Sequence, residues 1–109
     1  GKDGSRLGLL DERGKTRASM AAGIDGAAVG VSDEKGQPRA LLGISKGESR
    51  LNLFDEKGKT RAWLVISTDG PGLGLCDEKG QSRALLAIAD NRPSLGLLDA
   101  HGKWIWVQH

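Results

Sequence analysis

Cysteine, histidine and tyrosine are scarce in this sequence, and each shortage excludes a kind of chemistry. The 109 residues include one cysteine, two histidines and no tyrosine. The single Cys76 excludes a disulfide framework and a cysteine metal site within the chain. A hydrolase needs a nucleophile, a base and an orienting group, but His101 falls in a predicted turn and His109 is the last residue. The sequence therefore predicts neither an enzyme nor a bound cofactor.

A strong charge imbalance and long apolar runs are also absent. Lys and Arg number 16 and Asp and Glu number 14, which gives a net charge of +2. A nucleic-acid-binding protein usually carries a clustered basic face, whereas here each basic residue stands close to an acidic one, so no nucleic-acid partner is expected. No run of 18 apolar residues is present, which predicts no membrane insertion by this segment. No signal peptide is visible either.

What the sequence does contain is a tandem repeat of 22 residues that is rich in glycine. Each unit has an aspartate, a glycine three residues later and, in most units, an Arg-Ala pair that begins six residues after the aspartate. The aspartates are Asp11, Asp33, Asp55, Asp77 and Asp99, and the arginines are Arg17, Arg39, Arg61 and Arg83. We expect one domain with units near 1–10, 11–32, 33–54, 55–76 and 77–98, followed by a C-terminal cap over 99–109, because terminal repeats usually differ from the others.

Apolar residues alternate with other residues inside each unit, as they do over residues 51–53. A period of two is typical of β-strands, and the Asp-x-x-Gly and Asp-Gly blocks between the alternating runs are typical of hairpin turns. Each unit should therefore hold two short strands. The sequence predicts an all-β fold, an antiparallel meander of about ten short strands built from 22-residue hairpin repeats.

The register of the hairpins can be predicted from parity, because directly opposed residues share a face of the sheet. A two-residue turn at Lys57-Gly58 places Leu53 opposite Ala62 and keeps the apolar residues together. A three-residue loop would instead place Leu53 opposite Arg61, so we predict the even loop. Parity likewise predicts that Asp69-Gly70 lies at the tip of the return turn.

One face of such a sheet carries Val, Leu, Ile and Ala in every repeat. Burying one leucine is worth roughly 1.5–3 kcal/mol, and so large an apolar patch is unusual on a soluble monomer. We therefore expect the face to close by self-association, as a homotrimeric β-prism or fibre-like shaft. A β-barrel or folded-over sandwich within one chain, and a dimer, are the alternatives.

Three sets of residues are candidates for binding. The turn aspartates suggest calcium, but a calcium loop needs several converging oxygens, and an Asp before a turn more often bonds its own backbone, so no metal site is predicted. Arginine offers a bidentate fork to an acidic glycan, although it can also pair with neighbouring acids and cover apolar surface. Tryptophans near the C-terminus either cap the sheet or bind a ligand. The candidate ligand-binding residues are Arg17, Arg39, Arg61, Arg83, Trp63, Trp104 and Trp106.

These motifs resemble a group of bacterial, mostly uncharacterised envelope or secreted proteins with tandem Leu-x-Leu-x-Asp-x-x-Gly-x-x-Arg-Ala-x-Leu units. Members often end in a Gly-Lys-x-Ile-Trp stretch, which residues 102–106 match here. The resemblance covers nearly the whole chain and implies an extracytoplasmic location and an oligomeric array. Members often begin with a signal or membrane anchor and a coiled coil, and a coiled-coil stem would favour a trimer. The resemblance implies no activity and supplies no functional residue.

Two functions are compatible with these features. The first is a structural or spacer module of a bacterial surface or secreted assembly, which uniform repeats favour. The second is an adhesive module that binds a glycan or another ligand through repeated Arg and aromatic strips. A repeat that departs from the consensus on one face would favour the second, and the third repeat does so through Asn52, Phe54 and Trp63.

Overall fold

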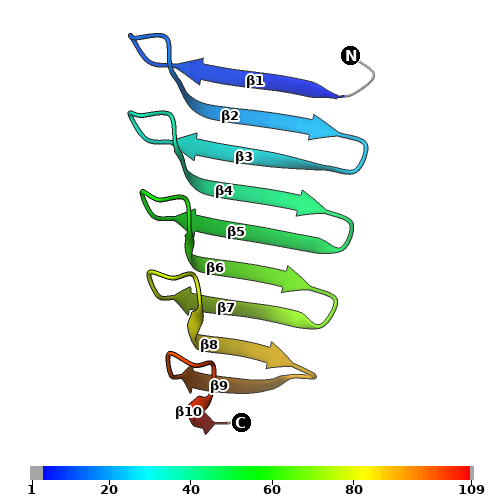
Figure 1. Cartoon of the computed structure of the whole chain (residues 1–109). Coiled ribbons are helices and arrows are strands. Elements are labelled where there is room, and N and C mark those ends of the chain that lie inside the picture. The colour runs from blue at the N-terminus through cyan, green and yellow to red at the C-terminus, as the bar shows by residue number, and fades with distance from the viewer. Residues whose placement is uncertain (1–3, 109) are drawn as a thin grey trace.

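The computed structural model describes residues 4–108, which form one ten-stranded antiparallel sheet. The strands lie across the sheet in chain order, so each pairs only with its neighbours in sequence (Figure 1). They are β1 (Ser5–Leu10), β2 (Thr16–Gly23), β3 (Gly26–Ser32), β4 (Pro38–Ser45), β5 (Glu48–Phe54), β6 (Thr60–Ser67), β7 (Gly70–Cys76), β8 (Ser82–Ala89), β9 (Arg92–Leu98) and β10 (Trp104–Gln108). The predicted all-β meander of ten strands is confirmed.

The Asp-x-x-Gly loops differ from the predicted two-residue turn. The N–H of Gly58 donates to the carbonyl oxygen of Asp55 at 3.0 Å, and the N–H of Asp55 donates to Lys59 at 2.9 Å. The loop therefore contains three residues, 56–58, and the prediction of an even loop is wrong. Gly58 has a φ of +85°, a conformation that glycine adopts without the steric cost of a side chain.

A β-bulge offsets the effect of the three-residue loop, so that apolar residues still face apolar residues across the hairpin. Phe54 pairs with Thr60 and Leu53 pairs with Ala62, so Arg61 is the extra residue of the bulge. An extra residue in one strand moves every later side chain to the other face. The predicted Leu53–Ala62 pair is therefore confirmed, although the turn that was expected to produce it is not the one observed. Equivalent bulges occur at the starts of β2, β4 and β8.

The return turns lie one residue earlier than predicted. Ser67 pairs with Gly70, so the tip of this turn is Thr68-Asp69 and not Asp69-Gly70. The shift changes the partner of each residue by two positions, so the same side chains stay on each face. Leu64, for example, faces Leu73 on the next strand.

The two faces of the sheet differ in composition. We call one of them the apolar face; its central cross-strand row consists of Leu7, Met20, Val29, Leu42, Leu51, Leu64, Leu73, Leu86 and Leu95. We call the other the small-residue face; its central row consists of Gly8, Ser19, Gly30, Leu41, Asn52, Trp63, Gly74, Leu85, Gly96 and Val107. Neither face is covered by another layer within the described residues, since only consecutive strands contact each other.

The single layer leaves residues 4–108 without a hydrophobic core. No apolar side chain in the described part of the chain is buried, and the molecule measures 47 × 29 × 16 Å. Because the sheet neither closes between β1 and β10 nor folds back on itself, the barrel and sandwich alternatives within one chain are wrong. The accessible surface is 8282 Å², whereas a compact monomer of 11.5 kDa exposes about 5,800 Å².

Candidate functional site

The apolar face is an extended surface that no other layer covers within residues 4–108. Its central row holds a large apolar side chain on each of the first nine strands, and Leu64 near the middle is 45% exposed. Two flanking rows contain no charged residue. They consist of Leu9, Ala18, Val31, Ala40, Leu53, Ala62, Leu75, Ala84 and Leu97 on one side, and of Ser5, Ala22, Ala27, Ile44, Ser49, Ile66, Pro71, Ile88 and Pro93 on the other.

A second surface feature is a column of charged groups at the strand ends that the Asp-x-x-Gly loops connect. The repeated aspartates hold these loops in shape. Asp55 Oδ1 accepts hydrogen bonds from the N–H groups of Lys57 at 2.9 Å and Lys59 at 3.0 Å. The same two bonds occur at every other aspartate of the column. This bonding of an aspartate to its own turn is the interpretation that the sequence favoured over calcium binding.

Each arginine of the column connects its own hairpin to the next strand. Arg61, the bulge residue, places Nη1 at 3.6 Å from Asp55 Oδ2 and donates from Nε to the carbonyl oxygen of Cys76 at 2.9 Å. Arg17, Arg39 and Arg83 make the equivalent contacts in their units. These contacts use Nε and Nη1 of each guanidinium. The arginines are thus placed as ties between hairpins, with side chains that are 40–45% exposed.

The same contacts lower the pKa of every aspartate in the column below the ordinary value of 3.8. For Asp55 the largest cause is the hydrogen bond from the backbone N–H of Lys59, which stabilises the charged form. Partial burial raises the pKa, while the N–H of Lys57 and the guanidinium of Arg61 lower it further. The carboxylates are therefore held ionised by their own loops.

The three predicted tryptophans are divided between the two faces of the sheet. Trp63 and Trp104 lie on the small-residue face, where their indoles cover Gly74 and Gly96. Trp106 pairs with Leu97 and so belongs to the apolar face. The candidate ligand-binding residues therefore lie in three places. The arginines lie beside the Asp-x-x-Gly loops, Trp63 and Trp104 lie on the small-residue face, and Trp106 lies on the apolar face.

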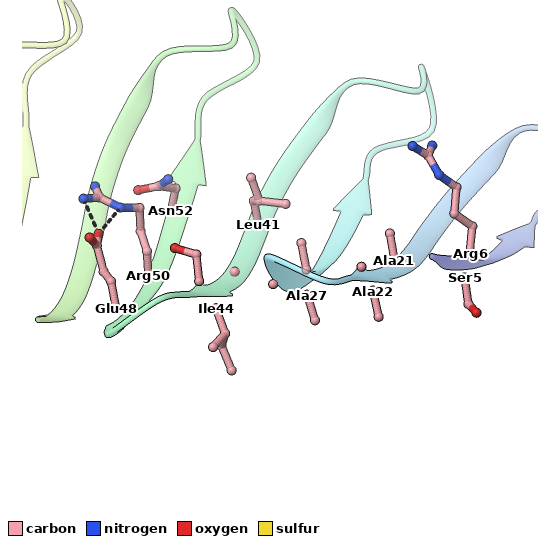
Figure 2. Close-up of a pocket in the computed structure, with 15 residues that line it drawn as sticks. Ser5, Arg6, Ala21, Ala22, Ala27, Leu41, Ile44, Glu48, Arg50 and Asn52 are labelled. Atoms are coloured by element: carbon pink, nitrogen blue, oxygen red, sulfur yellow. Dashed lines mark hydrogen bonds and ion pairs between the residues drawn. The ribbon is translucent and has the colours of Figure 1, made fainter. Parts of the chain in front are cut away.

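A shallow hollow of about 400 Å³ lies on the N-terminal half of the small-residue face. Figure 2 shows Arg6 and Arg50 rising on the same side of the sheet, with Ala21 between them. Arg50 donates from Nε and Nη2 to Glu48 Oε1, at 3.0 and 2.7 Å. Neither arginine was among the predicted site residues. The available signal was their departure from a repeat column that holds Ala28, Gly72 and Ser94 in the other units.

Neither metal ligands nor a membrane-spanning helix is found in the described part of the chain. No group of three or more His, Cys, Asp or Glu side chains comes together between residues 4 and 108. None of the described residues form a helix long and apolar enough to cross a membrane. In the comparisons with known proteins, no protein-family model matches the chain. No curated protein matches it significantly.

Proposed function

We propose that this chain is a structural module whose apolar faces pack together in a homotrimer, forming a prism-shaped shaft. The observation that carries the proposal is the apolar face, whose three rows of side chains are mostly apolar and contain no charged group. The chain exposes about 2,500 Å² more than a compact monomer of its mass would. Obligate interfaces bury a total area of this order or larger, so packing of whole faces accounts for the excess.

The size pattern of the apolar side chains favours three copies over two. The central row is large throughout, whereas the flanking rows alternate large and small residues, as in Leu53, Ala62, Leu75 and Ala84. Two stacked sheets leave a gap of about 10 Å across their whole width. Three sheets in a triangle are farthest apart at their centres and converge at the corners. Large central residues would then fill the axis, while a Leu of one copy packs on an Ala of the next at each corner.

This arrangement places the small-residue face on the outside of the shaft. The ion pairs of the aspartate and arginine columns would lie along the loop edges, where they remain in water and keep the assembly soluble. The resemblance to repeat-containing envelope and secreted proteins supports an extracytoplasmic location for such a spacer. The proposal includes no catalytic activity and no cofactor.

The shape of the assembly in solution tests the proposal. We expect small-angle X-ray scattering to give a longest dimension close to the 47 Å of one chain, because copies packed face to face share the same long axis. Association through the free edges of β1 and β10 would place sheets end to end instead. A longest dimension near twice that of one chain would therefore contradict face-to-face packing.

A further inference from the structure

We propose that Trp63 and Trp104 form a platform on the small-residue face that binds a neutral β-1,4-linked glycan of the glucan or chitin type. This proposal does not rest on trimer formation, because the platform and the apolar face lie on opposite sides of the sheet. The orientation of the two indoles, their spacing and the Ser94 hydroxyl beside them support it.

The indole of Trp63 lies flat on β7. A Cβ atom added to Gly74 would collide with three atoms of the ring, Cε2, Cζ2 and Nε1. A Cβ atom on Gly72 would lie 3.8 Å from Cζ3 of the same ring. One face of the indole is therefore packed against the backbone of two glycines, and Gly74 is buried beneath it. Trp63 is half-buried, and because no other layer covers this face within the described residues, the opposite face of its ring points away from the sheet.

Trp104 of β10 likewise covers a glycine of its adjacent strand, β9. A Cβ atom on Gly96 would collide with the six-membered ring of Trp104, and Gly96 is likewise buried although Trp104 is 56% exposed. Gly74 and Gly96 both pair with Leu85 of β8, so the two indoles lie about two strand spacings apart, or roughly 9.6 Å. Alternate rings of an extended β-1,4-linked chain present the same face at a similar interval.

The indole of Trp63 is larger than the side chain that is needed to cover a glycine at this position. Aromatic side chains often cover glycines in strands, but the equivalent residues of neighbouring repeats are Leu41 and Leu85. Leu41 already covers Gly30, with Cδ1 at 3.7 Å from the position of an added Cβ. A leucine is thus sufficient at this position, and the tryptophan adds a broad flat π surface.

The surroundings of the indoles fit a neutral sugar chain. Pyranose rings with equatorial hydroxyls present a face of C–H bonds, which packs on the electron-rich face of an indole. Leu85 lies between the two rings and keeps the strip apolar, and a depression beside Trp104 is lined by Ala87, Ser94 and Val107 among others. The Ser94 hydroxyl supplies a hydrogen-bond donor in the lining of this depression.

The test measures binding of cellohexaose and chitohexaose by intrinsic tryptophan fluorescence, together with retention on insoluble cellulose and chitin. We expect the full chain to bind at least one of these glycans with little dependence on salt. Trp63→Leu, which installs the residue of the neighbouring repeats, and Trp104→Leu should each weaken binding by about tenfold. Arg6→Ala, on the same face but at the other end of the sheet, is the control and should bind as the unmodified chain does.

Circular dichroism shows whether each variant keeps the sheet, and Trp63→Phe provides a second, milder replacement that retains an aromatic face. Absence of binding to both glycan types by the unmodified chain would overturn the proposal. So would unchanged binding by folded Trp63→Leu and Trp104→Leu proteins. Retention on heparin alone, lost when salt is raised, would also overturn it and would assign binding to the arginines instead.

Discussion

Replacement of Leu64 by glutamate is expected to abolish assembly, whereas replacement of its neighbour Val65 by glutamate is not. Leu64 lies in the central row of the apolar face and Val65 on the small-residue face. In a trimer the three substituted carboxylates would meet near the axis, and an unpaired charge out of water costs several kcal/mol. Because a single layer without a core is marginal by itself, we expect the Leu64→Glu chain to lose its folded structure as well.

The two substitutions separate assembly from intrinsic strand preference. In the isolated sheet Leu64 is more exposed than Val65, so a chain that stayed monomeric would tolerate Leu64→Glu at least as well as Val65→Glu. Val65 also faces Arg50 on the adjacent strand, where a glutamate gains an opposite charge. Mass by sedimentation and sheet content by circular dichroism provide the measurements. Equal behaviour of the two variants would show that the apolar face is not an interface.

Acid is expected to destabilise the protein steeply below about pH 4. The five aspartates of the column have pKa values below the ordinary value of 3.8 in the folded chain. Their contribution to stability is therefore complete above that value and is lost as the pH falls through the lower pKa of the folded state. Protonation removes the charge that accepts two backbone N–H bonds at all five aspartates. At Asp11, Asp33, Asp55 and Asp77 it also removes the charge that pairs with an arginine.

Denaturation midpoints measured from pH 6 to pH 2 test this dependence. Asp55→Asn removes one charge from the column and should make the acid loss of stability shallower, because one fewer proton is taken up on unfolding. Asp69→Asn, at the tip of a return turn, removes a charge without removing such bracing hydrogen bonds and is the matched control. A midpoint that stayed constant or rose between pH 5 and pH 2 would contradict the role assigned to the aspartates.

The strands and their faces were predictable because alternation and repeat spacing are strong local signals. The Leu53–Ala62 pair followed from parity alone. The turn could not be derived in this way, since parity gives the loop length only if both strands stay regular up to the loop. A three-residue loop and a bulge at Arg61 together give the same parity as a two-residue loop, and only the three-dimensional arrangement distinguishes them.

The candidate sites were less predictable, because a residue type that recurs every 22 residues does not show which groups its side chains contact. The bulge directs Arg61 to Asp55 and to the carbonyl of Cys76, so the predicted glycan-binding arginine is also a tie between strands. The predicted Trp63 and Trp104 share a face, but their stacking on Gly74 and Gly96 depends on the cross-strand register, which sequence spacing alone left undetermined.

The absolute mass of the protein in solution, measured by light scattering after size exclusion, tests the central claim most directly. The proposed shaft predicts a mass of three 11.5 kDa chains that persists on dilution, since the apolar faces cover each other. A mass of two chains would contradict the prism and indicate two stacked sheets. A folded protein with the mass of one chain would contradict the account, because its apolar face would then lie open to water.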